Sequence, residues 1–359
     1  MLAFELKAHL RALSEAHGAS GHEAPVREIV RAAWADLVDE FEQDGLGSLI
    51  GIKRGTGTSA KPGAHKIMLA AHMDEIGFLV RHIDDKGFVR LQPVGGFDPR
   101  TLVAQRVVVH GFAGQRLVGA LQPGTKPIHV LDPSEVKPLK LEELYVDLGM
   151  AADAVRSMVE VGDMVTLDRG LEPVGDCVVS RALDDRVGLF VMIEAMRAAT
   201  GTACEIVAVA TTQEEVGLRG ARTSAHAVQP DVSVALDVTL AVDTPGGSPE
   251  AAVTELGKGV ALKVMDSSHL SNPKLVRHFR DLADEADIPY QLELLPRGGT
   301  DAGAMQLSRD GSAAITISIP TRYVHTVNEM ASQADIAGAI DLLARFLGTV
   351  GDRDYGYAV

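Results

Sequence analysis

Apolar residues in this chain follow two patterns, continuous short runs and positions at helical spacing. Continuous apolar runs occur at 66–71, 204–212, 231–238 and 313–320, and such runs are typical of strands buried on both faces. Apolar residues at helical spacing predict helices over 4–16, 184–199 and 272–288, and a last helix that ends near 347. Because these strands and helices alternate, we expect an α/β fold with a mixed, mostly parallel sheet covered by helices on both faces.

Capping and turn residues predict where several elements begin. Ser20 and Glu23, followed by Pro25, have the spacing of a capping box that opens a helix running to about Leu37. Ser332 and Asp335 have the same spacing before the last helix. Asp44-Gly45 is a turn signal that predicts a hairpin of short strands.

A segment with the sequence pattern of short β-strands interrupts the α/β pattern. Between 76 and 167 the chain shows short runs of alternating apolar and polar residues, with turn signals at 85–87, 95–96 and 111–114. This pattern predicts a small barrel or sandwich. We therefore expect one discontinuous α/β domain, 1–75 plus 168–359, with an all-β domain inserted at 76–167. There is no internal repeat or low-complexity segment.

Composition narrows the class of protein. The 359 residues are 46% hydrophobic and 23% charged, with a net charge of −15, which argues against a nucleic-acid partner. Only two cysteines occur, Cys177 and Cys204, so no disulfide framework is expected. The N-terminus lacks the apolar core of a signal peptide, and no apolar run approaches the ~20 residues of a membrane span. We expect a cytoplasmic protein that does not bind membranes.

Histidines and carboxylates cluster where the predicted strands end. In open α/β sheets, binding sites collect beyond the carboxyl ends of the strands. Imidazole and carboxylate together suit zinc-like metal ions. The residues at these positions are His72 and Asp74, Glu214 and Glu215, Asp237, His325, and Asp184 with Asp185 before the helix over 184–199.

Each of these residues also has an ordinary alternative. Asp184 and Asp185 could cap a helix, Asp237 could open a turn, and the Glu214–Glu215 pair could sit in the first turn of a helix. Convergence of several such residues on one edge of the sheet favours a metal site over coincidence.

Spacing within the cluster suggests separate roles. Residues i and i+2 of a strand point the same way, so Asp74 can accept a hydrogen bond from the His72 ring. Glu214 and Glu215 are adjacent and cannot easily bind one ion from the same side of an extended chain. One of the two is therefore expected to bind metal and the other to act as a base beside a bound water.

Several blocks in the same order resemble the tetrahedral aminopeptidase family, the glutamyl or deblocking aminopeptidases, some of whose members carry a cellulase label. The matching stretches are AAHMDEIGF (70–78), SRALDDRVG (180–188), TTQEEVGLRGA (211–221), ALDVTLAVDTPG (235–246), RGGTDAGA (297–304) and PTRYVHT (320–326). They run through nearly the whole α/β part of the chain.

The resemblance implies a dinuclear metallopeptidase and assigns roles to residues. His72 and Asp237 would hold one metal ion, Glu215 and His325 the other, and Asp184 would bridge both. Asp74 would orient His72, and Glu214 would be the general base. Thr300 and Asp301 would belong to the substrate-side loop. The metal ions would be zinc, with cobalt or manganese as alternatives, and the 76–167 insertion would be a dimerisation domain within a tetrahedral dodecamer.

The chain departs from the family pattern near the site. Asp185 stands where Asn is common, and Leu240 and Val242 stand where His and Gly are common. These departures bear on substrate preference, which the sequence leaves open. The function we expect is removal of N-terminal residues from peptides. A related dinuclear deacylase or dipeptidase, or a non-enzymatic metal-binding scaffold, would use similar ligands, whereas a glycosidase is disfavoured because the acids are better explained as ligands.

Overall fold

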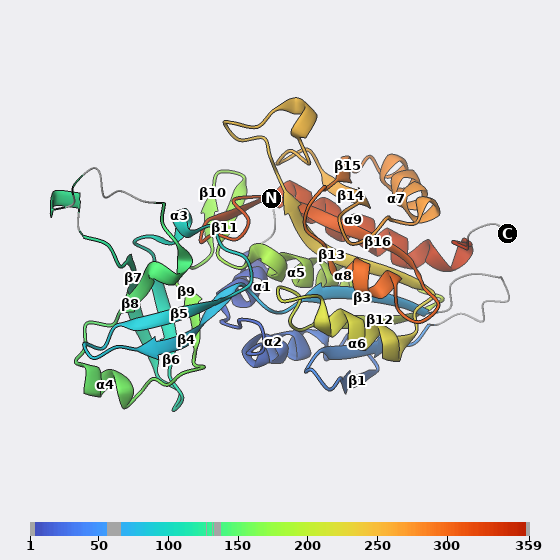
Figure 1. Cartoon of the computed structure of the whole chain (residues 1–359). Helices are drawn as coiled ribbons and strands as arrows, with labels where there is room; N and C mark the ends of the chain where they lie inside the picture. Colours follow the sequence, from blue (N-terminus) through green and yellow to red (C-terminus); the bar gives the residue numbers. More distant parts are fainter. Residues whose placement is uncertain (1–3, 56–65, 127, 131, 133–137, 357–359) are drawn as a thin grey trace.

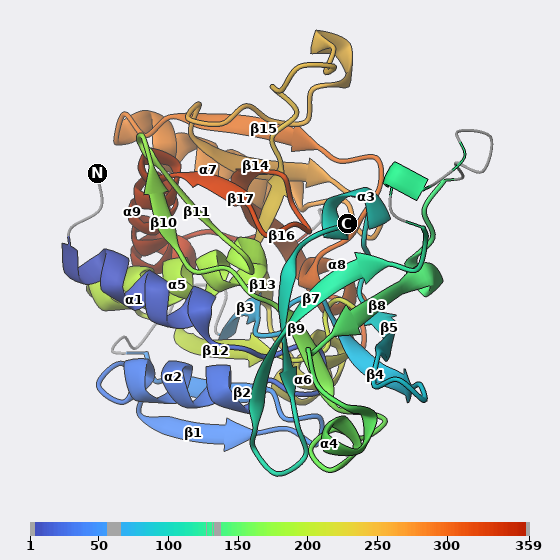
Figure 2. The same ribbon diagram turned by 90° about the vertical axis from the view of Figure 1, so that its left-hand side faces the viewer.

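The computed structural model describes residues 4–55, 66–126, 128–130, 132 and 138–356. It shows an α/β unit with a β-barrel projecting from one side (Figures 1 and 2). The helices are α1 Phe4–Glu15, α2 Ala24–Trp34, α3 Pro99–Leu102, α4 Ala152–Arg156, α5 Leu183–Ala198, α6 Arg219–Val228, α7 Pro273–Glu285, α8 Asp301–Gln306 and α9 Gln333–Thr349. None of these helices is both long and apolar enough to cross a membrane.

The sheet of the α/β unit is parallel at its centre and antiparallel toward its edges. Its strand order is β1-β2-β12-β3-β13-β16-β17-β11-β10, and β14 joins β16 and carries β15. The central strands β12, β3, β13 and β16 run parallel, so their carboxyl ends share one edge. The strands are β1 Glu40–Gln43, β2 Leu49–Lys53, β3 Lys66–His72, β10 Glu172–Val174, β11 Cys177–Ser180, β12 Glu205–Thr211, β13 Val232–Leu240, β14 Val260–Met265, β15 Tyr290–Leu294, β16 Ala313–Arg322 and β17 Glu329–Ser332.

Continuous apolar strands arise because helices cover both faces of this sheet. Along β3, Ile67 and Leu69 pack into the core shared with α1, α2, α5, α7 and α9. The alternate residues Met68 and Ala70 face the smaller core under α6 and α8. A strand with two buried faces has no polar side, so the expected α/β sheet with helices on both faces is confirmed.

The insertion forms a closed six-stranded antiparallel barrel. Its strand order is β4-β5-β8-β7-β6-β9, and alternate residues such as Phe78, Val80 and Val107 fill its own core. The expected barrel-like insertion is therefore confirmed. Its strands are β4 Gly77–Ile83, β5 Val89–Val94, β6 Arg106–His110, β7 Arg116–Pro123, β8 Leu144–Asp147 and β9 Met164–Leu167.

One of the two expected capping boxes is wrong, and the other holds in part. Helix α2 begins at Ala24 with no side-chain cap, because Ser20 donates to Asp74 Oδ2 at 2.6 Å and Glu23 accepts the Gln213 N–H at 3.1 Å. Ser332 does cap α9. Asp335 instead accepts the N–H groups of Gly257 and Gly259. Ser20, Glu23 and Asp335 thus form hydrogen bonds with residues distant in sequence rather than with the helix ends beside them.

Candidate functional site

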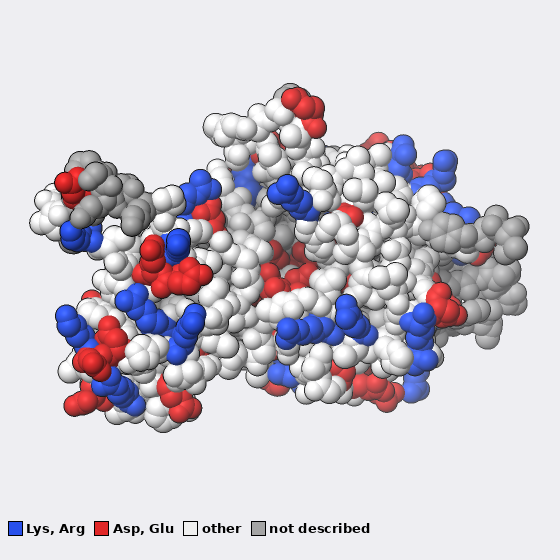
Figure 3. Space-filling view, viewed as in Figure 1, with Lys and Arg blue, Asp and Glu red and all other residues white. Residues whose placement is uncertain are grey.

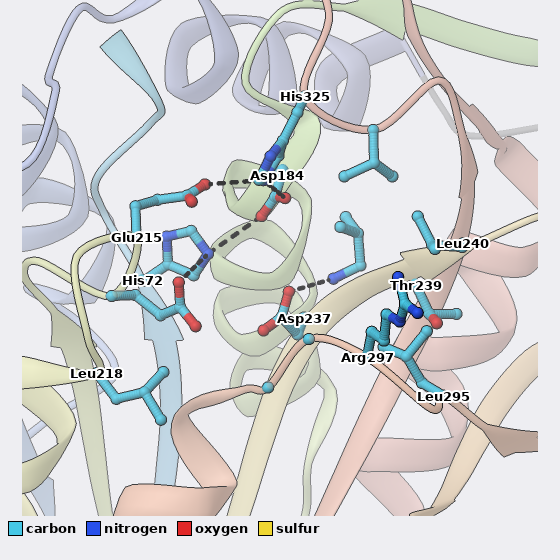
Figure 4. Close-up of a pocket in the computed structure, with 15 residues that line it drawn as sticks. His72, Asp184, Glu215, Leu218, Asp237, Thr239, Leu240, Leu295, Arg297 and His325 are labelled. Carbon is cyan, nitrogen blue, oxygen red and sulfur yellow. Dashed lines mark hydrogen bonds and ion pairs between the residues drawn. The ribbon is translucent and has the colours of Figure 1, made fainter. Parts of the chain in front are cut away.

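The carboxyl ends of the four central strands bring the expected residues together (Figure 4). His72 ends β3, Asp237 lies near the end of β13, Glu214 and Glu215 follow β12, and His325 follows β16. Asp184 reaches the same edge from the start of α5. In the space-filling view, acidic residues lie at the bottom of a hollow in the face of the molecule (Figure 3).

Among the described residues these side chains form three overlapping groups of possible ligands: one joins His72, Glu214 and Glu215, and the other two share the Asp184 carboxylate. His72, Asp184 and Asp237 offer ligand atoms within 4.8 Å of one another, and so do Asp184, Glu215 and His325. Asp184 Oδ1 lies 3.1 Å from His72 Nε2, and its Oδ2 lies 3.4 Å from His325 Nε2. Asp184 is therefore placed to contact two centres at once.

Electrostatics show that the cluster concentrates negative charge. Burial raises the pKa of the Glu214 and Asp237 carboxyls well above their ordinary values, and neighbouring carboxylates raise both further. Burial alone would lower the pKa of His325, but its hydrogen bonds to Asp184 and Glu215 raise it to about 12. Among the described residues, the imidazoles of His72 and His325 lie within 4 Å of carboxylates in this cluster, and the charge of Lys263 also acts on Asp237.

This donor set fits divalent metal ions. Zinc-type ions take imidazole nitrogens and carboxylate oxygens, and two dications would compensate carboxylates that are costly to bury. Asp184 is only 8% exposed and Asp237 only 7%, so bulk water supplies little compensation. Each group of three also leaves positions for a water or a substrate.

A further set of buried carboxylates holds the main chain of these residues. Asp74 accepts the N–H groups of Glu214 and Glu215 at 3.0 and 3.2 Å. Glu329 accepts the N–H groups of Asp184 and His325 at 3.0 and 2.8 Å. These contacts fix the turns that present the site residues, including His325, whose φ of 64° is unusual for a non-glycine residue.

The expected Asp74–His72 contact differs in detail. The His72 Nδ1 atom lies 2.9 Å from the Asp74 main-chain oxygen and 3.5 Å from its carboxylate. Hydrogen bonding to the carbonyl fixes the ring tautomer. The Asp74 carboxylate instead serves the Glu214–Glu215 turn, which brings a third segment of chain to the site.

The site opens into a cavity of about 500 Å³. Beyond the acidic cluster its wall is mostly apolar, with Arg297 as the one lysine or arginine among the described lining residues (Figure 4). This part of the wall consists of Leu218, Val238, Thr239, Leu240, Leu295, Arg297, Gly298, Gly299 and Val324.

Thr300 and Asp301 do not line this cavity. Thr300 is buried against Thr316, with 2.8 Å between their hydroxyl oxygens. The Asp301 carboxylate is buried and accepts the Thr211 hydroxyl at 2.5 Å. The residues just before them, 297–299, form the wall of the cavity instead.

Comparison with known proteins identifies the family. Residues 47–342 match the model of the M42 glutamyl aminopeptidase family. The chain is 40% identical over 327 residues to a protein of Acetivibrio thermocellus named as an aminopeptidase, covering 91% of this chain and 93% of that one. It belongs to the M42 family. A lysyl aminopeptidase of Pyrococcus furiosus is 35% identical and covers 96% of this chain and 98% of its own.

Solved structures of aminopeptidases show the same fold. An aminopeptidase from Desulfurococcus kamchatkensis superposes with a TM-score of 0.90 at 38% identity, over 96% of this chain and 94% of that chain. The TET1 peptidase of Pyrococcus horikoshii, which can assemble into a tetrahedron or a large octahedral shell, gives 0.83 at 29% identity, over 95% and 99%. Membership of the M42 family makes this chain a peptide-hydrolysing enzyme.

Three residues near this M42 site escaped sequence reasoning. Glu329 follows His325 by four positions, which is no local signal of contact. Asp185 belongs to the cluster that the sequence predicts, but the sequence assigns it no role; it is fully buried and accepts the His72 N–H at 3.2 Å. Arg297 was quoted in RGGTDAGA, but nothing in that motif indicates that its side chain enters the cavity.

Proposed function

We propose that this chain is a metal-dependent aminopeptidase that uses two divalent ions, zinc first and cobalt or manganese as alternatives. The observation that carries the proposal is the pair of overlapping ligand groups sharing Asp184, with Glu214 beside them. His72 and Asp237 would hold one ion, Glu215 and His325 the other, and Asp184 both. When bound, the ions would polarise the scissile carbonyl and lower the pKa of a water.

Glu214 is the general base in this proposal. Its Oε2 lies 4.0 Å from His72 Nε2, and its carboxyl faces the cavity. Glu214 could join His72 and Glu215 in a ligand group, but it belongs to neither of the two groups that share Asp184. Burial raises its pKa well above the ordinary value, which brings it nearer to the pH at which a carboxylate can take and return a proton. Glu214 takes the proton of the attacking water and passes it to the leaving amine, while Asp74 holds the turn that carries it.

The alternatives explain less of the cavity. A metal-binding scaffold needs no unligated carboxylate next to its ligands and no adjoining cavity. A deacylase or dipeptidase could use the same centre, but the relatives along nearly the whole chain are aminopeptidases. The N-terminal side chain of a peptide suits the largely apolar wall of the adjoining cavity.

We further propose that the barrel, within residues 76–167, is a dimerisation domain and that dimers assemble into a tetrahedral dodecamer. Support comes from the TET1 peptidase of similar fold and from exposed apolar residues on the barrel. The catalytic domain would be 1–75 with 168–359. A cytoplasmic location stays a prediction.

The test is metal removal and return with matched substrates. Chelated protein should lose turnover of leucine anilide, and zinc, cobalt or manganese should restore it, with two ions per chain by elemental analysis. N-acetyl-leucine anilide should resist cleavage, because it lacks the free amino group. Full activity in metal-free protein would overturn the mechanism, and faster cleavage of the acetylated substrate would favour a deacylase.

A further inference from the structure

Arg297 is an unpaired cation inside a cavity whose other end is acidic. Its side chain is exposed and makes no hydrogen bond or ion pair with another described residue. In Figure 4 it lies with Thr239, Leu240 and Leu295 on the far side of Asp237 from Glu215. The cavity therefore has the proposed metal centre at one end and an uncompensated positive charge along its wall.

The main chain on both sides of Arg297 is anchored. Leu295 N–H donates to the Met265 carbonyl at 3.0 Å, and Ser267 N–H donates to the Gly298 carbonyl at 3.1 Å. Gly298 has a φ of +94°, a conformation that a residue with a side chain rarely adopts. This loop therefore delivers Arg297 to the same place on the wall rather than leaving it on a free segment.

A second cation near the wall is already neutralised. Lys263 is fully buried, and its Nζ lies 2.8 Å from Glu293 Oε1, an atom that also accepts the Thr239 hydroxyl at 2.6 Å. Asp266 lies 3.6 Å from the same Nζ. Lys263 thus stiffens the wall, whereas the charge of Arg297 is free to meet a ligand.

The shape of the cavity directs the N-terminal side chain of a peptide toward this wall. In the proposed function the free α-amino group and the scissile carbonyl both belong at the end of the cavity that holds the proposed metal centre and Glu214. The side chain of the same residue then has the rest of the cavity, where Leu240, Leu295 and Val324 can contact its methylenes and Arg297 its end.

We infer that Arg297 is a specificity-determining residue that selects peptides with an acidic N-terminal residue and disfavours those with lysine or arginine. This inference rests on the proposed aminopeptidase function. Family membership leaves the preference open, because the family description names glutamyl substrates while the Pyrococcus furiosus relative is a lysyl aminopeptidase. A guanidinium donates paired hydrogen bonds to a carboxylate, which a neutral amide of the same shape cannot match.

The experiment compares Glu, Gln, Leu and Lys anilides on the metal-loaded full-length enzyme. Glu and Gln share one shape, so the ratio of their kcat/KM values reports charge alone. We expect the ratio to favour Glu by about fivefold, for a pair that stays solvated, up to about a hundredfold for a desolvated one. High salt should reduce the ratio, because a partly exposed pair is screened.

Variants assign the effect to one side chain. Arg297→Gln should bring the Glu:Gln ratio close to one, and Arg297→Glu should make Lys a better substrate than Glu. The control is Arg222→Gln, another exposed arginine, which lines a neighbouring depression and not this cavity. It should keep the wild-type ratio.

The outcomes separate the two proposals. A wild-type Glu:Gln ratio near one, or a ratio that Arg297→Gln leaves unchanged, overturns the role of Arg297 even if Leu anilide is cleaved. The role of Arg297 is also overturned if the enzyme prefers acidic residues only at later positions of a peptide and not at the N-terminal position. If Arg297→Gln loses all turnover, the wild-type enzyme is the test: a Glu:Gln ratio above one that falls in high salt supports the role of Arg297, and a ratio near one overturns it. Failure to cleave any anilide after metal loading counts against the proposed function itself.

Discussion

Two adjacent glutamates occupy different surroundings at the candidate site. Glu215 Oε1 lies 3.3 Å from His325 Nε2, within one ligand group that includes Asp184. Glu214 belongs to neither group containing Asp184, although it forms a third group with His72 and Glu215, and it faces the cavity. Both precede helix α6, which begins only at Arg219, so an ordinary role in the first turn of a helix does not explain them.

Matched substitutions should separate their roles. Glu214→Gln keeps shape but cannot take a proton, so we expect both ions to stay bound while kcat falls by about 10²–10⁴-fold. Glu215→Gln removes a charged ligand, so one ion should be lost and excess metal should restore part of the activity. Metal analysis and anilide turnover measure both. Loss of metal in Glu214→Gln with two ions kept in Glu215→Gln would reverse the assignment, and normal turnover in both would refute it.

At the scale of elements, buried carboxylates connect segments that are distant in sequence. Glu329, at the start of β17, ties the first turn of α5 to the turn after β16 by accepting one N–H from each. Asp74 does the same for the turn between β12 and α6. The positions of the proposed ligands are thus set by contacts between elements and not by any one element.

The two hydrogen bonds that Glu329 accepts, from the N–H groups of Asp184 and His325, predict a selective loss of metal when Glu329 is changed. Glu329→Gln turns one acceptor into a donor that faces an N–H, so Asp184 and His325 should be held less firmly. We expect the affinity for the ion at Asp184, Glu215 and His325 to fall about 10–100-fold, as measured by titration calorimetry on the apo protein.

A control distinguishes this from general destabilisation. The control is Glu194→Gln, which changes a buried carboxylate on α5. Glu194 does not line the cavity, and its Oε1 lies 2.9 Å from His9 Nδ1. This variant should bind metal as the wild type does. Equal loss of metal in both variants, or no loss in Glu329→Gln, would contradict the proposed role of Glu329 in holding Asp184 and His325.

At the scale of the whole molecule, the barrel has its own core and also exposes apolar side chains. Phe112, Val118 and Val161 are each more than half exposed. The barrel contributes none of the proposed ligands, and the TET1 peptidase of similar fold assembles into shells. Assembly is therefore the role we propose for it.

Charges placed on the barrel should dissociate the assembly. We expect Phe112→Asp combined with Val118→Asp to convert a large oligomer into smaller species, seen as a lower mass by light scattering, because burying a charge is costly. Leu46→Asp, at an exposed apolar position between β1 and β2, is the control and should keep the wild-type mass. A wild-type chain that is monomeric and fully active would refute the proposal.

The sequence by itself determined the α/β class, the barrel insertion and the residues at the strand ends. Runs such as 66–71 and 313–320 carry this information because burial on two faces imposes a local pattern. Short elements were not predicted, among them α8, which is rich in Ala and Gly, and the edge strand β15. Such segments gain their stability from neighbours, so their own periodicity is weak.

Only the tertiary structure decided which polar groups meet. The sequence predicts that Ser20 and Glu23 cap a helix, but they bind Asp74 and Gln213. It predicts Thr300 and Asp301 on the substrate side, but Arg297 lines the cavity instead. A buried hydrogen-bonding group takes whichever partner the packed elements bring within reach, and that partner can lie anywhere in the sequence. The order of strands β12, β3, β13 and β16, which places those partners, is set by packing over the whole sheet and not by any local pattern.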